Sequence, residues 1–394
     1  MTAILRDFTS WFDFSLSPQY YNADHEAWRG VLRQFIDKEI APFIDEWEEA
    51  STFPRELYGK AAQVGLLQLG YPEKYGGVEK PDTFYDIVTS QELARVGGGG
   101  VHPSLNSHTI GMPPIVALAS EEIKAKVIPE VISGEKISAL AITEPSGGSD
   151  VANLRTTARR EGDVYIVNGS KTFITSGVRA DYYTVAVRTG GEGAGGISLL
   201  LIEKDTPGFT QTGLDKMGWW CSDTATLYFD DCRVPVANLI GEENKGFAGV
   251  MINFNAERLN IAAMANGLAM VCMDEAVAWA RERKTFGKTL MSHQVIRHKI
   301  AEMAKRILST QSLLEKTAWQ MDQGVVPVVE LSLLKVQATE TMEYCAREAV
   351  QIFGGMGFMR GNKVERIYRE VRVYAIGGGS EEIMRDLAAR QLAL

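Results

Sequence analysis

A long stretch near the middle of the chain, residues 246–286, most constrains what this sequence can fold into. It contains no proline and reads GFAGVMINFNAERLNIAAMANGLAMVCMDEAVAWARERKTF. The residues that follow Glu257 by four, seven, eight and eleven positions are all apolar: Ile261, Met264, Ala265 and Leu268. Residues at this spacing share one face of an α-helix, so the pattern predicts a long helix that turns Glu257 toward the protein interior.

Glu257 is the charged member of this apolar stripe. A carboxylate on a buried face costs free energy unless it is paired or takes part in chemistry. The adjacent Arg258 does not face it, because neighbouring residues of a helix point about 100° apart. The helix alone therefore leaves two interpretations open: a structural ion pair with a distant Lys or Arg, or a functional carboxylate.

Length and charge limit the class of protein. A chain of 394 residues exceeds a single hydrophobic core, so two or three domains are expected. Its 45% hydrophobic and 23% charged residues are typical of a soluble globular protein. The net charge of -9 argues against nucleic acids and anionic membranes as the main partners.

The sequence shows no pattern typical of a metal site or a membrane anchor. The cysteines lie far apart, so we expect packing thiols in a reducing compartment: Cys221, Cys232, Cys272 and Cys345. The histidines form no HExxH pair, and no metal site is predicted. No apolar run approaches ~18 residues, so no membrane span is predicted. The N-terminal sequence MTAILRDFTSWFDF matches neither a signal peptide nor a transit peptide. We therefore expect a bacterial cytoplasmic location, and a mature mitochondrial matrix form stays open.

The first part of the chain is predicted to be helical. Apolar residues at helical spacing indicate helices at about 24–42, 57–67, 83–95 and 115–132. Asp24 and Ser120 are placed to cap two of these helices, and Pro42 and Pro129 to end them.

Between residues 137 and 239 the pattern changes to short strands separated by turn residues. Strands are expected at 164–167, 171–175, 182–187, 197–202 and 224–229. The pair Asn168-Gly169 supplies the positive φ angles of a tight turn and predicts a hairpin between the first two of these strands.

After Gly246 the chain is predicted to be helical again, with further helices at 292–311, 331–353 and 381–394. The predicted fold class is α+β, with three domains. They are an N-terminal α-helical domain at 1–136, a central antiparallel β domain at 137–243, and a C-terminal four-helix-bundle-like domain at 244–394.

Five sequence blocks carry a resemblance to a known family. They are AITEPSGGSD at 141–150, NGSKTFIT at 168–175, RKTFG at 283–287 with Gln294, QIFGGMG at 351–357, and the stretch 376–385. A single block is weak evidence because glycine-rich loops are common, but five in order and spacing are specific. Over nearly its whole length the chain resembles the acyl-CoA dehydrogenase family and its fold.

The resemblance implies that FAD is the cofactor. Four residues are then expected to contact the flavin ring or its side chain: Ile142, Thr143, Phe173 and Thr175. A flavin needs a flat apolar wall, with hydroxyl and backbone donors near N1 and N5. Many relatives have Trp where this chain has Phe173, so the packing should be slightly looser; without the resemblance Phe173 is an ordinary strand residue.

The remaining cofactor residues are expected at loops and helix ends, because no Rossmann fingerprint is present. By resemblance, the pyrophosphate and adenosine are held by Arg283, Thr285, Phe286 and Gln294, and Ser380 and Glu382 complete the set. Gln351 and Gly355 match residues that reach the FAD of a neighbouring subunit. Glycine allows close backbone approach there, and an additional role as a helix C-cap is compatible with this.

The resemblance also implies a substrate site for an acyl-CoA thioester. Ser149 would bind the CoA part, or is a turn hydroxyl. Asn255 and Arg258 match positions at the pantetheine and phosphate end, although Arg258 could instead brace the helix. The backbone N–H of Gly378 would donate to the thioester carbonyl, which requires no side chain.

The family performs α,β-dehydrogenation, in which a carboxylate takes a proton from Cα and hydride leaves Cβ for flavin N5. Many members carry the base in a Tyr-Glu-Gly-Thr motif, but Gly378 occupies that position here. Glu381 and Glu382 read as first-turn acids of the next helix. A minority, including the isovaleryl and long-chain enzymes, have glycine there and a Glu on the long helix. Glu257 is therefore predicted to be the catalytic base.

The expected function is an acyl-CoA dehydrogenase of fatty acid β-oxidation, acting on a medium-chain, long-chain or branched substrate. The expected assembly is a homotetramer, and the expected electron acceptor is an electron-transfer flavoprotein. Two alternatives are weighed. An acyl-CoA oxidase-like enzyme is disfavoured by the short chain. A non-catalytic flavoprotein that binds nucleic acid is disfavoured by the acidic composition.

Overall fold

The computed structural model describes residues 10–14 and 17–394. Residues 1–9, in which a targeting signal would begin, lie outside the described residues. The chain divides into two compact units. The sheet unit comprises Phe43–Pro81 and Gly100–Glu257, and the helical unit comprises the chain up to Pro42, Asp82–Gly99 and Arg258–Leu394. Both units are assembled from segments that are not consecutive in the sequence, so the division into 1–136, 137–243 and 244–394 stays a prediction.

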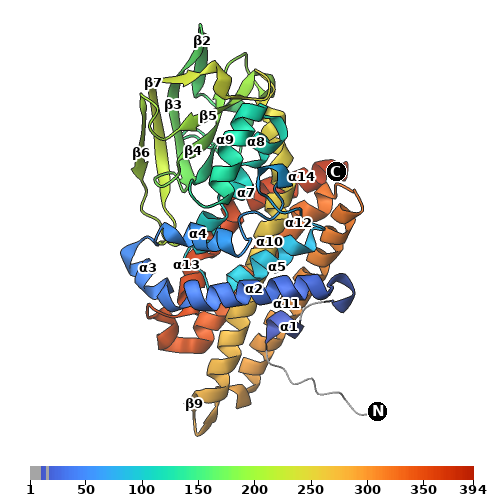
Figure 1. Ribbon diagram of the computed structural model, residues 1–394. Helices are drawn as coiled ribbons and strands as arrows, with labels where there is room; N and C mark the ends of the chain where they lie inside the picture. The colour runs from blue at the N-terminus through green and yellow to red at the C-terminus, as the bar shows by residue number, and fades with distance from the viewer. Residues whose placement is uncertain (1–9, 15–16) are drawn as a thin grey trace. The chain divides into compact units, whose positions relative to one another are not determined.

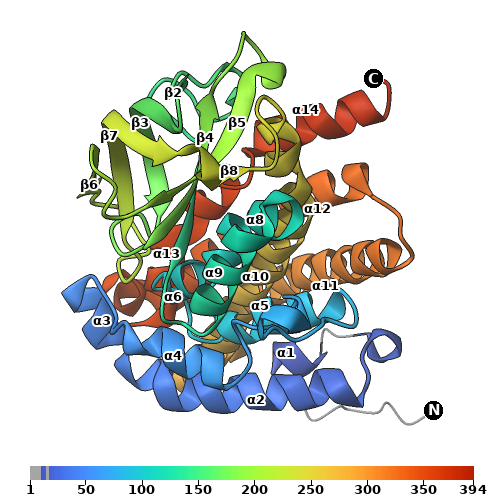
Figure 2. The ribbon, with the colours of Figure 1, turned by 45° about the horizontal axis from the view of Figure 1, so that its top comes forward.

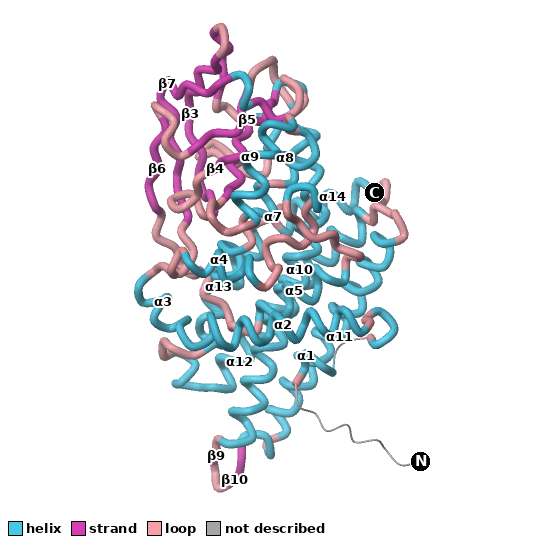
Figure 3. Tube along the Cα trace, in the orientation of Figure 1, coloured by secondary structure: helices cyan, strands magenta, loops and turns pink. Residues whose placement is uncertain are grey.

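The sheet unit is built on one eight-stranded sheet (Figure 3). Its strands are β1 (Ser138–Ala141), β2 (Thr157–Glu161), β3 (Val164–Thr175), β4 (Tyr182–Arg188), β5 (Ile197–Glu203), β6 (Phe209–Gly213), β7 (Thr224–Pro235) and β8 (Leu239–Ile240). The order is β6-β7-β3-β2-β4-β5-β8, and β1 pairs with β4 beside this path. Most pairings are antiparallel, as predicted, while β1 and one residue pair of β2 run parallel to β4.

The hairpin predicted at Asn168-Gly169 is wrong. These residues lie inside the continuous strand β3, where the pairing with β7 shifts register between Val167 and Gly169. Gly169 has a φ of 140° and packs closely, since an added Cβ would lie 2.8 Å from the Thr156 Cα atom. The Asn168 side chain bonds to Asp231 on β7 in both directions. The positive-φ signal therefore marks a β-bulge and not a chain reversal.

The sheet unit also contains six helices among the described residues. They are α3 (Ile44–Ala50), α4 (Glu56–Gln63), α6 (Val101–Leu105), α7 (His108–Gly111), α8 (Pro113–Leu118) and α9 (Glu121–Ile132). Figure 2 shows α8 and α9 beside β5 and β8, and their apolar residues form one core with the sheet, including Ile115, Ile128 and Leu199. Ser120 caps α9 as predicted, but Pro129 lies inside that helix and does not end it. The helix predicted at 57–67 is α4, which ends at Gln63.

The helical unit contains the other helices (Figure 1). They are α1 (Trp11–Phe14), α2 (Ala23–Glu39), α5 (Phe84–Ala94), α11 (Gln294–Asp322), α12 (Val328–Phe353), α13 (Lys363–Ile376) and α14 (Glu381–Gln391). The N-cap of α2 is Asn22, whose side chain accepts from the backbone of Asp24 and His25. Asp24 was predicted as the cap and lies instead in the first turn, where an acid also favours the helix dipole.

The predicted central helix is present as α10, Gly246–Glu282. Residues 262–273 are buried without exception, so this part of α10 is buried on all sides and not along one stripe. Among the described residues α10 is the one helix long and apolar enough to cross a membrane by length and composition. In its most apolar stretch of 18 residues, 78% is buried inside the protein, and such burial is typical of a core helix.

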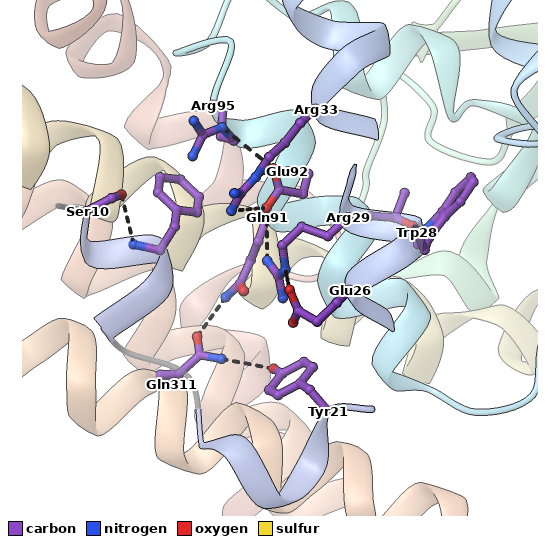
Figure 4. Close-up of polar contacts among 12 residues, drawn as sticks. Ser10, Tyr21, Glu26, Trp28, Arg29, Arg33, Gln91, Glu92, Arg95 and Gln311 are labelled. Atoms are coloured by element: carbon purple, nitrogen blue, oxygen red, sulfur yellow. Dashed lines mark hydrogen bonds and ion pairs between the residues drawn. The ribbon is translucent and has the colours of Figure 1, made fainter. Parts of the chain in front are cut away.

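Helices α2 and α5 are joined by a buried ion-pair cluster (Figure 4). The Glu92 carboxylate is fully buried and lies 2.9 Å from Arg29 Nη1, 3.0 Å from Arg33 Nε and 3.6 Å from Arg95 Nε. The neighbouring Gln91 donates to Gln311 on α11 at 2.7 Å. A buried carboxylate with several cations holds these helices in one register because each charge needs its partners.

Candidate functional site

In the sheet unit, a buried ion pair fixes the loop that follows β1. The fully buried Lys171 on β3 donates to the Ile142 carbonyl at 3.0 Å and to Glu144 Oε1 at 2.8 Å. Glu144 also accepts from the backbone N–H groups of Arg155 at 2.6 Å and Thr156 at 2.8 Å. Burial opposes the charge of Glu144, but hydrogen bonds and the Lys171 charge outweigh it and lower its pKa to about 2. Burial lowers the pKa of Lys171 to about 8 against the opposing effect of Glu144.

This ion pair brings two of the predicted flavin segments together. The Thr172 N–H donates to the Thr143 carbonyl at 2.9 Å, so residues 142–143 lie against the end of β3. Ile142 and Thr143 are half-buried, and so is Thr175 at the last position of the strand. The structure therefore groups Ile142, Thr143, Phe173 and Thr175.

Phe173 is held in an unusual conformation at this place. Its φ is 60°, and it lies where β3 shifts register against β7 between Lys171 and Ile174. A positive φ is unfavourable for a bulky residue and indicates local strain. The side chain is 70% exposed, which leaves an aromatic surface open beside the 142–143 loop.

Ser149 lies in the exposed loop that continues from this group. Glu144 and Gly147 close a tight turn through two backbone hydrogen bonds of 3.2 and 3.0 Å. Ser149 follows two residues later and is exposed. Its hydroxyl is thus available to a ligand, and no side-chain hydrogen bond shown by the structure commits it elsewhere.

In the helical unit, a two-stranded hairpin after α10 carries the second predicted group. Strands β9 (Lys284–Thr285) and β10 (Lys288–Thr289) are joined by Phe286 and Gly287, which have φ values of 52° and 78° (Figure 3). The Phe286 side chain is 96% exposed. Thr285 Oγ1 lies 3.1 Å from Nε2 of His293, the residue before Gln294. The hairpin and the start of α11 therefore group Arg283, Thr285, Phe286 and Gln294.

The end of α12 carries Gln351 and Gly355, both exposed. The helix ends at Phe353, and Gly354 takes a φ of 64°. Gly355 has no positive φ, and an added Cβ would meet no atom within 4 Å. Among the described residues, a side chain at position 355 would therefore meet no atom, and the role of Gly355 beside a neighbour's FAD stays a prediction.

The turn between α13 and α14 contains Gly378, with a φ of 67°. Ser380 is the N-cap of α14, and its Oγ accepts from the Ile383 N–H. The pKa of Glu382 is lowered by a hydrogen bond from its own backbone N–H and then by a hydrogen bond from the Ser380 side chain. Glu381 is committed elsewhere, since its carboxylate accepts from Thr339 Oγ1 at 2.8 Å and lies 3.6 Å from Arg385.

Sequence reasoning missed a residue that holds this turn from a neighbouring helix. Lys335 on α12 is fully buried and donates to the carbonyls of Ala375 at 2.9 Å and Gly379 at 2.8 Å. Lysine is normally an exposed residue. Its position within the apolar pattern of 331–353 was the one available signal.

The remaining predicted site residues lie on α10. Asn255 and Glu257 are half-buried, and Arg258 is buried. The boundary between the two units falls between Glu257 and Arg258. The assignment of Glu257 as a base stays a prediction, as do the contacts of Asn255 and Arg258 with a substrate.

Each of these groups, taken by itself, has side chains that suit one part of a flavin dinucleotide. Phe173 offers an exposed aromatic surface beside backbone and hydroxyl groups, and the β9–β10 hairpin offers an exposed aromatic ring beside the exposed Arg283. A guanidinium is suited to bidentate binding of a pyrophosphate. Among the described residues no group of three or more His, Cys, Asp or Glu could hold a metal ion. The four cysteines, all among the described residues, are buried and form no disulfide, as expected for packing thiols.

Comparison with known protein families gives three matches. The N-terminal domain of acyl-CoA dehydrogenase matches residues 22–135, the middle domain residues 139–232 and the C-terminal domain residues 244–393.

Individual proteins match over nearly the whole chain. An acyl-CoA dehydrogenase of Bacillus subtilis is 39% identical, covering 92% of this chain and 96% of its own. The mitochondrial long-chain specific acyl-CoA dehydrogenase of Rattus norvegicus is 37% identical, covering 94% and 87%. A solved structure named as a probable acyl-CoA dehydrogenase of Mycobacterium abscessus is 46% identical, with a TM-score of 0.93 and coverage of 95% and 100%. A glutaryl-CoA dehydrogenase of Mycobacterium smegmatis in complex with FADH2 is 27% identical, with a TM-score of 0.90 and coverage of 95% and 96%.

Proposed function

Because the chain belongs to the acyl-CoA dehydrogenase family, we propose that it oxidises an acyl-CoA to the trans-2-enoyl-CoA with Glu257 as the base. The predicted fold and the predicted FAD cofactor are confirmed, since the relatives are flavoproteins of this fold. The enzyme is an oxidoreductase that dehydrogenates an acyl-CoA. The base, the chain length and the assembly are proposals.

The proposed reaction balances over two bonds of the substrate. The Glu257 carboxylate takes the Cα proton, and the electron pair of that C–H bond forms the Cα=Cβ bond. FAD supplies the acceptor for the hydride that leaves Cβ. The Gly378 N–H donates to the thioester carbonyl oxygen, where negative charge develops as the proton leaves.

The assignment of Glu257 as the base is supported by the lack of a suitable carboxylate in the described turn after α13. Gly378 has no side chain that could act as a base, and the Glu381 carboxylate is occupied by Thr339 and Arg385. Glu257 is the half-buried carboxylate that the resemblance offers instead.

The substrate is proposed to carry a medium, long or branched acyl chain. The long-chain specific relative supports this, since it covers 94% of the chain. We also propose an electron-transfer flavoprotein as the acceptor, a homotetrameric assembly and a cytoplasmic location in a bacterial host.

The test of the base is the variant Glu257→Gln. Glutamine keeps the size and hydrogen-bonding reach but removes the proton acceptor, so FAD and acyl-CoA should still bind. The rate constant of anaerobic flavin reduction at saturating acyl-CoA should fall by the ~10²–10⁴-fold typical of a lost general base. It is measured as bleaching of the flavin absorbance in a stopped-flow instrument.

The matched control is Glu275→Gln. Glu275 is another half-buried carboxylate of α10, but it lies 3.2 Å from Lys363 and has no proposed role in the chemistry. Its loss should leave the reduction rate close to that of the parent. If Glu257→Gln also reduces flavin at the parent rate, Glu257 is a structural carboxylate. Rapid reoxidation of the reduced parent enzyme by oxygen alone would instead favour the oxidase alternative.

A further inference from the structure

Two hydrogen bonds of the buried Lys335 ammonium group converge on a single turn. This group donates to the Ala375 carbonyl at 2.9 Å and to the Gly379 carbonyl at 2.8 Å. The first carbonyl belongs to the last turn of α13, and the second immediately precedes Ser380, the N-cap of α14. Lys335 thus joins the end of one helix to the start of the next.

The two carbonyls flank Gly378 on either side. Gly378 and Gly379 have φ values of 67° and 99°, and the Gly377 N–H donates to the Val373 carbonyl at 2.8 Å. Glycine adopts such angles without steric cost, but it also leaves a free turn many alternative conformations. A turn of three glycines therefore needs outside contacts to point one N–H in a fixed direction.

A second contact from α12 reinforces the turn. Thr339 lies one helical turn after Lys335 and donates to Glu381 Oε1 at 2.8 Å, in the first turn of α14. The two side chains lie on the same face of α12 because residues four apart in a helix are neighbours. One rigid helix therefore holds both ends of the glycine turn.

The charge of Lys335 makes this contact specific. A buried ammonium group carries a large desolvation cost, which only well-placed acceptors offset. Displacement of either carbonyl would break a hydrogen bond to this buried charge, so the turn is restrained at the two carbonyls that Lys335 contacts.

We propose that Lys335 is a positioning residue that holds the Gly378 N–H in the direction needed to bind the thioester carbonyl. This inference rests on the proposed function, which assigns that N–H to the carbonyl. Lys335 touches neither substrate nor cofactor in this assignment. It acts through the turn, and its loss should weaken stabilisation of the enolate-like charge more than it weakens acyl-CoA binding.

The test compares Lys335→Met with Thr341→Val in the FAD-loaded enzyme. Methionine keeps the length of the side chain without a donor. Thr341 is a matched control because it is buried on the same helix and bonds to Thr310 at 2.9 Å, away from the turn. Two readouts are used: flavin reduction by acyl-CoA, and the pH titration of bound acetoacetyl-CoA, whose acidic α-proton ionises without redox chemistry.

Lys335→Met should lower the reduction rate constant at saturation by at least about tenfold, and by no more than the ~10²–10³-fold that loss of an oxyanion donor itself would cause. The pH at which bound acetoacetyl-CoA ionises should rise by about one unit, which corresponds to a tenfold change. The dissociation constant of acyl-CoA should change less than threefold. Thr341→Val should match the parent in all three quantities.

The outcomes separate this inference from the proposed function. If the parent enzyme neither bleaches with acyl-CoA nor ionises acetoacetyl-CoA, the proposed function fails. If the parent does both and Lys335→Met behaves as Thr341→Val does, Lys335 is only structural and the inference is overturned.

If Lys335→Met does not fold, hydrogen exchange of the parent enzyme tests whether the glycine turn is held in one conformation. The Gly377 amide, which donates to the Val373 carbonyl, should exchange at least about tenfold more slowly than the Val326 amide in the exposed loop 323–326. Equal exchange rates would show that the glycine turn is not held, and would overturn the inference.

Discussion

At the scale of single residues, buried lysines are the feature that organises the site. Lys171 and Lys335 are both fully buried, and each donates to backbone carbonyls that adjoin predicted ligand residues. Lys171 holds the Ile142 carbonyl, and Lys335 holds the carbonyls around Gly378. In both places the lysine is not itself a predicted ligand residue. It holds the backbone of residues that are predicted to contact FAD or the acyl-CoA.

Phe173 gives the residue-scale prediction for the cofactor. Phe173→Ala should leave the stability of the FAD-free protein within about 0.5 kcal/mol, because a 70% exposed side chain loses little packing. FAD affinity should fall about tenfold, since an aromatic pair contributes about 0.5–1.5 kcal/mol beyond its buried area. Thermal unfolding and fluorescence titration with FAD measure the two effects.

Tyr228→Ala is the control for this prediction. Tyr228 lies on β7 of the same sheet and is 44% exposed, but it has no predicted contact with the flavin. Its removal should leave FAD affinity unchanged. Equal FAD affinity in Phe173→Ala and the parent would return Phe173 to the status of an ordinary strand residue.

At the scale of elements, the ion pair between the β1 loop and β3 predicts a pH dependence. The pKa of Glu144 is lowered to about 2 in the folded protein, from an ordinary value near 4.5. A lowered carboxyl pKa stabilises the fold above the ordinary pKa, and that stabilisation is lost as the pH falls from about 4.5 to about 2.

Glu144→Gln should therefore destabilise the protein by about 3 kcal/mol at pH 7, because Lys171 keeps a buried charge without its partner. The difference between variant and parent should shrink progressively below pH 4.5. Thermal unfolding midpoints at pH 7, 4.5 and 3 measure it. A difference that stays constant down to pH 3 would mean that the Glu144 carboxylate is not stabilised by folding.

Two helices were predicted nearly to their ends from the spacing of apolar residues. Helix α5 was expected at 83–95 and spans Phe84–Ala94, and α12 was expected at 331–353 and spans Val328–Phe353. Strand β2 was missed because only one of its five residues is buried, which leaves no alternation to detect. Helix α13 was missed although Val364, Ile367, Val371 and Tyr374 are buried at helical spacing.

Predictions from turn and proline residues were wrong where the same local sequence is compatible with two structures and tertiary contacts decide between them. Asn168-Gly169 has the φ preferences of a turn, but pairing with β7 makes it a bulge. Pro129 removes one hydrogen bond of α9, and packing of that helix in the sheet-unit core outweighs the loss. The motif blocks identified the candidate site residues, whereas Lys335 could not be found because its two carbonyl partners lie 40 and 44 residues away.

At the scale of the whole molecule, the surface of the helical unit leaves large apolar side chains in water. Phe286 is 96% exposed and Phe358 is 85% exposed, and Met356 beside Gly355 is 52% exposed. Exposed apolar groups of this size are typical of surfaces that a ligand or another subunit covers. They support the proposed homotetramer and the role of Gly355 in the FAD site of a neighbouring subunit.

The variant Gly355→Leu tests this proposal. A side chain at 355 meets no atom of the chain within 4 Å and needs no positive φ, so the subunit itself should fold normally. If a neighbour or its FAD approaches this backbone, the leucine blocks that approach. We expect at least a tenfold loss of FAD affinity, about 1.4 kcal/mol, together with partial dissociation of the tetramer. Light scattering and the flavin content per chain measure both, with circular dichroism to verify folding.

Gly191→Leu is the matched control, because Gly191 lies in the exposed β4–β5 loop and is equally free of atoms around an added Cβ. It should retain full FAD content and the parent's size. If Gly355→Leu also retained full FAD content and the parent's size, Gly355 would have no role beyond the end of α12. A parent protein that is monomeric and still holds FAD tightly would refute the shared site as well, since no second subunit would then be needed to complete it.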